Sequence, residues 1–131
     1  MRLHIFRLKP SQDLRKELER LTRAKKIRTG FVITAVGNLD QATVRLAGAK
    51  KSKIVPGPLE IVSLVGTLSP DGPHLHLSIA DRHGKVLGEH LKDGCVVRTT
   101  CELVIGESET HEFNRVSDPQ TGYEELKIVL K

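Results

Sequence analysis

Apolar residues recur at helical spacing in only one stretch of the chain, residues 11–27 (SQDLRKELERLTRAKKI). Four of them share one face of a 3.6-residue repeat: Leu14, Leu18, Leu21 and Ala24. Ser11 suits the position that caps such a helix, and Asp13 lies in its first turn. Gly30 is the residue expected to end it. The pattern predicts one main helix near the N-terminus.

In the rest of the chain the apolar pattern has a period close to two, which is typical of strands. MRLHIFRLK at the start is an expected strand, and FVITAV and QATVRLA flank turn residues 37–40, which indicates a hairpin. Further strands are expected in LEIVSLVGTL, HLHLSIA, KVLGEHL and CVVRTTCELVI, with a last short strand in the tail. The sequence therefore predicts a single α+β domain over residues 1–131. It consists of a mostly antiparallel β-sheet flanked by one main N-terminal helix.

Two histidines stand one residue apart in the predicted strand HLHLSIA, and a third follows after a turn. Residues i and i+2 of a strand share a face, so His74 and His76 point the same way, about 6.6–6.8 Å apart. Whether His90 joins them depends on the turn between the two strands.

The turn residues favour one particular register. Asp81 and Gly84 suit the first and fourth positions of a type I turn, and Gly84 can also adopt the left-handed conformation. This describes a three-residue hairpin loop in which Asp81 pairs with Lys85. Counting back along both strands places His90 opposite His76 and on the same face. The sequence thus predicts three convergent imidazoles.

Three imidazoles suit Zn²⁺ and leave its fourth coordination position for water or a ligand. Other divalent metals also bind imidazole, so the three nitrogens do not select one metal. The alternative is a polar strand face on which histidines line up without binding anything. An enzymatic alternative is a zinc-dependent, hydrolase-like protein in which the metal activates water. Glu60 and Glu102 lie in strands apolar enough to bury them, and are candidates to support the histidines or to act as general bases. The favoured alternative for each is a buried carboxylate paired with Arg45 or Arg98.

Charge is distributed unevenly along the chain. Residues 1–56 hold fourteen Lys or Arg and four Asp or Glu, whereas the remainder is acidic. The loop residues Lys50, Lys51 and Lys53 are candidates for weak, salt-sensitive phosphate contacts. Only four aromatic residues are present, and no zinc-finger or helix-turn-helix spacing occurs. Weak, sequence-tolerant DNA binding is therefore a third hypothesis.

Cys95 and Cys101 lie six residues apart in one predicted strand, roughly 20 Å from each other. A disulfide requires a Cα separation of about 4.4–6.8 Å, so both are expected to be reduced packing residues. No apolar run approaches the roughly 20 residues of a membrane span. The N-terminus also lacks the apolar core of a signal peptide. We therefore expect a cytoplasmic protein without a membrane segment.

Several ordered segments together resemble the PPC (plant and prokaryote conserved) domain, whose members are often labelled DNA-binding-protein-like and also occur in plant AT-hook nuclear proteins. The matching segments are GPLEIVSLVGTLS, HLHLSIADRHGKVLGEHL, GCVVRTTCELVIG and FNRVSDPQTGYEEL. The resemblance covers nearly the whole chain, although no AT-hook core (Arg-Gly-Arg-Pro) is present. It implies an antiparallel sheet flanked by helices and assembled as a trimer.

The resemblance also implies a metal site, because the His-x-His and the later histidine form one in prokaryotic members. The matching residues here are His74, His76 and His90. One departure is Gly88-Glu89-His90, where the family pattern has Gly-Gly-His; alternation points Glu89 away from the histidine face. We therefore expect a small homotrimeric protein that binds zinc or another divalent metal. It would act as an interaction or regulatory module with a protein partner, and would bind DNA only weakly if at all.

Overall fold

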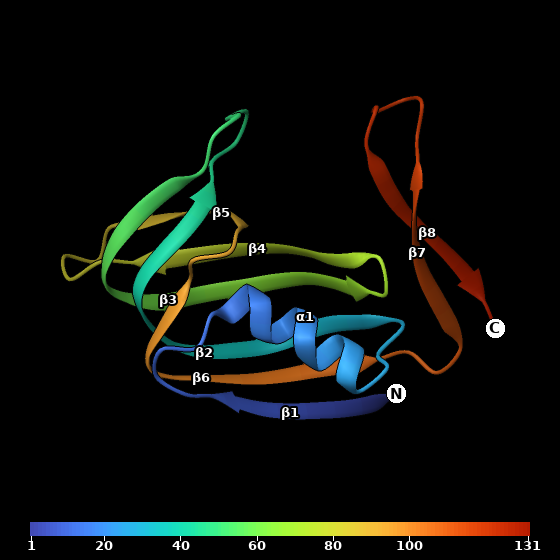
Figure 1. The fold of residues 1–131 in the computed structure, drawn as a ribbon, viewed down its shortest axis with the longest axis horizontal. Coiled ribbons are helices and arrows are strands. Elements are labelled where there is room, and N and C mark those ends of the chain that lie inside the picture. Colours follow the sequence, from blue (N-terminus) through green and yellow to red (C-terminus); the bar gives the residue numbers. More distant parts are fainter.

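The computed structural model describes residues 1–131 and contains a six-stranded antiparallel sheet, one helix and a separate two-stranded hairpin (Figure 1). The elements follow the chain as β1 (Arg2–Leu8), α1 (Leu14–Ala24), β2 (Gly30–Arg45), β3 (Lys53–Ser69), β4 (Gly72–Ala80), β5 (Val86–Leu91), β6 (Val96–Glu107), β7 (His111–Ser117) and β8 (Glu124–Leu130). The strand order in the large sheet is β1-β6-β2-β3-β4-β5, and β7 pairs with β8 alone. The mostly antiparallel sheet with one short helix confirms the coarse prediction.

The core lies between α1 and one face of the large sheet. Leu14 and Leu18 of the helix are almost completely buried against sheet residues such as Leu39, Leu77 and Leu103. The opposite face of the sheet, here called the outer face, carries exposed apolar side chains instead: Leu3, Ile5, Val36 and Val65. α1 is too short and too polar to cross a membrane.

The helix is capped differently from the prediction. Asp13 is the N-cap, and its carboxylate accepts hydrogen bonds from the backbone N–H groups of Lys16 and Gly94. Ser11 has a positive φ of 73° and lies before the helix, so its predicted capping role is wrong. The helix also ends earlier than expected, at Ala24, and Lys26 turns the chain with a φ of 54°.

The hairpin expected around residues 37–40 is also wrong, because β2 is one continuous 16-residue strand. Gly37 belongs to an irregular stretch of its pairing with β6, where an added Cβ would lie 2.1 Å from the carbonyl oxygen of Thr100. The side chain of Asn38 accepts a hydrogen bond from the backbone N–H of Thr99. Gly37 and Asn38 are residue types common in turns, but here they allow β2 and β6 to approach each other closely.

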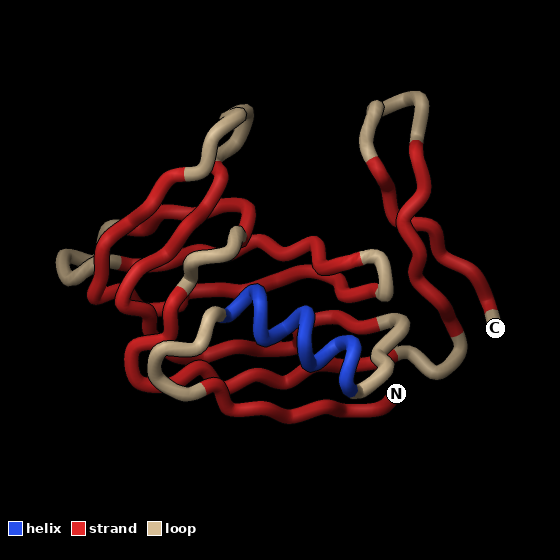
Figure 2. The backbone as a smooth tube through the Cα atoms, viewed as in Figure 1, coloured by secondary structure: helices blue, strands red, loops and turns tan.

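The large sheet closes partly on itself at the end of β2. Most of β2 has β6 as its neighbour, but its last two residues pair with β5, Val44 with Leu91 and Arg45 with His90. β5 is therefore held between β4 and β2. The tail forms two paired strands, β7 and β8, where one short strand was expected; Figure 2 shows this hairpin standing beside the large sheet.

Candidate metal centre

The β4–β5 hairpin has the register that its turn residues predict. The carboxylate of Asp81 accepts hydrogen bonds from the backbone N–H groups of His83 (2.9 Å) and Lys85 (3.0 Å). The backbone N–H of Gly84 donates to the carbonyl of Asp81, and Gly84 has a φ of 80°. These contacts fix a tight loop, and His76 pairs directly with His90.

All three predicted histidines converge on the outer face. Their ligating nitrogens lie within 4.8 Å of one another. The ring centroids of His76 and His90 are 4.5 Å apart, and those of His74 and His76 are 5.3 Å apart, both in edge-to-face arrangements. Glu89 pairs with buried Leu77, so it lies on the other face, as alternation predicts. The Glu89 departure from the family pattern therefore leaves the cluster intact.

The cluster contains an orphaned polar atom. His76 Nε2 is buried and has no hydrogen-bond partner. A buried imidazole nitrogen without a partner costs free energy, and a metal ion bound at this nitrogen would remove that cost. In tetrahedral geometry, Zn–N bonds of about 2.0–2.1 Å bring the nitrogens to roughly 3.3 Å from each other. Rotation of the imidazole rings supplies the approach that this requires, so the three residues fit a zinc ion.

The surroundings keep two of the imidazoles neutral. Desolvation is the main cause that lowers the pKa of His74, and the charge of Arg115 adds to it. Desolvation also lowers the pKa of His90, together with the charges of His76 and Arg45. Because only the neutral imidazole offers a lone pair to a metal, the lowered pKa values favour metal binding near pH 7.

Several cations lie beside the histidines. Arg45 pairs with His90 across the short β2–β5 ladder. His76 of β4, His90 of β5 and Arg45 of β2 therefore lie side by side on three neighbouring strands. Arg15, Arg45 and Lys92 lie around the same cavity, and desolvation and then the charges of Arg45 and Arg15 lower the pKa of Lys92. No local pattern predicts this arrangement, because the β2–β5 pairing joins residues more than forty positions apart.

A groove of about 1090 Å³ opens next to His74 and His90. Its walls come from the loop between β2 and β3, the beginning of β4, the end of β5, and the β7–β8 hairpin. Arg115 fastens the hairpin to the large sheet, since its backbone N–H donates to Asp71 and its guanidinium donates to Thr67. Arg115 is a residue of this site that the sequence pattern did not predict.

The other predicted site residues lie away from the cluster. Glu60 and Glu102 are both exposed, contrary to the expectation that their strands bury them. Both are on the outer face, where Glu60 pairs with Asn38 and Ala80 while Glu102 pairs with Val36 and Arg7. Neither carboxylate belongs to the histidine cluster.

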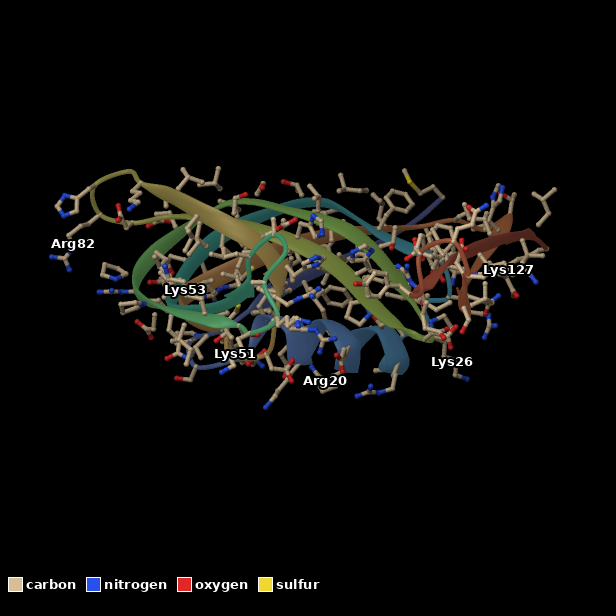
Figure 3. The ribbon with its side chains drawn as sticks, turned by 90° about the horizontal axis from the view of Figure 1, so that it is seen from above. Arg20, Lys26, Lys51, Lys53, Arg82 and Lys127 are labelled. Atoms are coloured by element: carbon tan, nitrogen blue, oxygen red, sulfur yellow. The ribbon has the colours of Figure 1, made fainter.

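Lys50, Lys51 and Lys53 are exposed in and just after the loop between β2 and β3. Figure 3 shows Lys51 and Lys53 at a distance from Lys26 and Lys127, with labelled basic residues spread around the periphery.

Two histidines outside the cluster have partners that the sequence did not reveal. His4 Nε2 lies 2.8 Å from Glu107 Oε2 in a largely buried pair, and the same carboxylate accepts a hydrogen bond from the backbone N–H of Arg28. His111 Nδ1 lies 2.9 Å from the hydroxyl of Thr110. His83 is exposed at the loop tip.

Similar chains include a Bifunctional protein GlmU from Synechococcus sp. (strain JA-3-3Ab), 48% identical over 128 residues. The match covers 98% of this chain and 21% of the relative, so this chain spans about a fifth of the length of that protein. A solved structure of a hypothetical protein from Salmonella enterica is 37% identical with a TM-score of 0.97, covering 99% of this chain and 94% of that one.

Another solved structure, described as a metal-containing protein from Archaeoglobus fulgidus, is 26% identical with a TM-score of 0.74. The alignment covers 95% of this chain and 91% of that one. The model of the Plants and Prokaryotes Conserved (PCC) domain matches residues 1–109, which include β1 to β6 and all three histidines. The chain therefore belongs to the Plants and Prokaryotes Conserved domain family, the one that its sequence segments resemble.

Proposed function

We propose that the chain is a small oligomeric protein that binds one zinc ion through His74, His76 and His90 and acts as an interaction or regulatory module. The observation that carries the proposal is the convergence of three imidazoles, one of which has a buried nitrogen without a partner. The Archaeoglobus fulgidus relative, described as metal-containing, supports a metal at this fold. The three imidazoles leave one coordination position of the zinc free for a ligand.

The metal would add stability to a fold that forms without it. His76 and His90 are already paired in a hairpin, and the core of the domain lies on the other face of the sheet. Zinc that binds only the folded state raises stability by RT ln(1 + [Zn]/Kd), which is about 2.7 kcal/mol at one hundred times Kd. We therefore expect a folded zinc-free chain with a lower thermal midpoint.

The test measures bound zinc per chain and the thermal midpoint, with and without chelator, for wild type and His76→Ala. His83→Ala is the matched control, because His83 is an exposed loop histidine outside the cluster. We expect one zinc per chain and a zinc-dependent midpoint in wild type and in the control, and neither in His76→Ala. Wild-type protein that takes up no zinc, and whose midpoint does not move on zinc addition, would disprove the metal site.

The outer face supports the oligomeric part of the proposal. Ile5 is 71% exposed and Val36 and Val65 are each more than half exposed, yet all lie on a regular sheet face away from the helix. Exposed apolar side chains gathered on one face are typical of an interface between proteins. We propose that copies of this chain cover the face by assembling as a trimer.

A further inference from the structure

We infer that the groove beside the three histidines binds a small anion that carries a carboxylate or phosphate group, with Arg45 as its main protein contact. This inference rests on the proposed metal site, since the free coordination position of the zinc would face the same anion. It goes further by naming the chemical class of the ligand and the residues that recognise it.

Arg45 is the residue that most clearly lacks a partner. Its Nε atom is buried without a hydrogen bond, and no side-chain hydrogen bond or ion pair involves its guanidinium. Only Nε is buried in this way, so a ligand in the groove can reach the two terminal nitrogens of the guanidinium, and a bound anion would offset its charge. Arg45 is also the strand neighbour of His90, so a group bound to its guanidinium lies next to the cluster.

Other cations of the groove also lack carboxylate partners. The guanidinium of Arg115 donates to the neutral hydroxyl of Thr67, which pairs with His74 across the β3–β4 ladder. Lys92 follows β5 closely and forms no ion pair. Arg15 differs, because Glu19 and Asp93 pair with it. An anion in the groove would therefore meet three cations, Arg45, Arg115 and Lys92, that form no ion pair within the chain.

The acidic groups of the groove do not neutralise these cations. Of the three carboxylates that line it, Asp71 accepts a hydrogen bond from the backbone N–H of Arg115, and Glu124 accepts one from the hydroxyl of Ser117. Glu125 lies on the hairpin side of the groove and is exposed. The groove is lined by five Lys or Arg residues and three carboxylates, so it keeps an excess of positive charge, to which the metal would add two further charges.

The shape of the groove favours a small molecule. Its volume of about 1090 Å³ is slightly above the usual range for small-ligand pockets, which reaches about 1,000 Å³. The β7–β8 hairpin and the loop between β2 and β3 contribute residues to its walls. Planar guanidinium groups bind carboxylate and phosphate oxygens through two parallel hydrogen bonds, and both oxygen types also bind zinc. A small anion with carboxylate or phosphate oxygens can therefore bind both the guanidinium and the zinc.

The experiment titrates the zinc-loaded and zinc-free wild-type chain with inorganic phosphate and, separately, with succinate, by calorimetry at low ionic strength. Arg45→Met and Arg45→Lys are the variants, and Arg82→Met is the matched control, since Arg82 is an exposed arginine at the hairpin tip. Zinc per chain is measured in every sample. The two probes separate a phosphate ligand from a carboxylate ligand.

We expect at least one probe to bind the zinc-loaded chain, with about tenfold weaker binding or more in Arg45→Met, partial recovery in Arg45→Lys and no change in Arg82→Met. Zinc-loaded protein that binds neither probe would overturn the inference but not the zinc site. The same holds if Arg45→Met binds both probes as tightly as wild type does. A chain that binds no zinc but binds a probe through Arg45 would support the anion site and disprove the zinc site. Binding of a short DNA duplex without either small anion would also overturn the inference.

Discussion

At the scale of single residues, His76 shows how burial gives a common side chain a specific chemistry. Its neighbours His74 and His90 approach from the same strand and from the paired strand. Desolvation lowers the pKa of both neighbours, so the cluster offers uncharged donors where a surface histidine would be partly protonated. The proposed zinc affinity therefore depends on how protons compete for these nitrogens.

We predict that zinc affinity is constant between pH 8 and 7 and falls as the pH drops below about 6.5. The pKa values of His74 and His90 lie below the ordinary value of 6.5, so both imidazoles are neutral above that pH and take up protons only below it. The zinc-free chain should lose stability in the same direction, because its folded state binds fewer protons than its unfolded state in that range. Equilibrium dialysis with zinc from pH 8 to pH 5 measures the effect, and a constant affinity down to pH 5 would contradict it.

A second residue-scale prediction concerns the two free cysteines. Cys95 and Cys101 are completely buried, and burial raises the pKa of Cys95 to about 11 and that of Cys101 to about 12. The thiolate is the reactive form, so both residues should resist a thiol reagent at pH 8. We expect no label per native chain and two labels after unfolding. Rapid labelling of the native protein would show that the strand β6 opens readily.

At the scale of elements, the features that could be predicted are those set by neighbouring residues. The Asp81 to Gly84 loop fixes the β4–β5 register through contacts within five residues, so alternation and turn chemistry located the three histidines together. The same reasoning failed at Gly37 and Asn38, where it predicted a hairpin turn. Their roles depend on strand β6, about sixty residues away, which the local sequence does not show.

The N-cap of α1 makes a contribution to the free energy of unfolding that can be measured. We predict that Asp13→Ala lowers the free energy of unfolding by about 1–2 kcal/mol, because the carboxylate satisfies the N–H of Lys16 and also that of Gly94. Urea denaturation measures the loss. Ser11→Gly is the control, and it should keep or slightly raise stability because Ser11 has a left-handed backbone. An Asp13→Ala chain as stable as wild type would rule out the capping role.

At the scale of the whole molecule, the pairing of β5 with the end of β2 brings Arg45 beside the histidines. The pairing is long-range, so the sequence alone did not place any cation in the site. The apolar outer face is likewise a property of the assembled sheet, since its members come from β1, β2 and β3. The first feature adds a cation to the site, and the second gives the sheet a surface that other molecules can cover.

We predict that light scattering at micromolar concentration gives a mass three times that of the 14.5 kDa chain. Val36→Glu should shift the protein towards smaller species, because it places a charge in the middle of the apolar outer face and beside Glu102. Arg82→Glu, at the exposed hairpin tip, should leave the mass unchanged. A wild-type mass of about 14.5 kDa would refute the proposed assembly.

Any DNA binding should be weak, independent of sequence and lost at moderate salt. The exposed lysines of the loop, Lys50, Lys51 and Lys53, offer phosphate contacts without base-reading groups. Replacing all three with glutamine should reduce binding of every duplex by the same factor, as measured by fluorescence anisotropy at 50 and 150 mM salt. Nanomolar binding of one sequence over scrambled competitors at 150 mM salt would contradict this prediction.

The β7–β8 hairpin has a consequence for how the domain opens. None of its residues is buried within the chain, and few side-chain contacts hold it to the rest of the domain. Arg115 donates two hydrogen bonds, the hydroxyl of Thr29 donates one to the carbonyl of His111, and Arg28 forms an ion pair with Glu112. Such a unit unfolds at a smaller free-energy cost than the core, so its backbone amides should exchange with solvent before those of β2 or β6. Because the hairpin forms one wall of the groove, each of these local openings would widen the groove beside the histidines while the rest of the sheet stays closed.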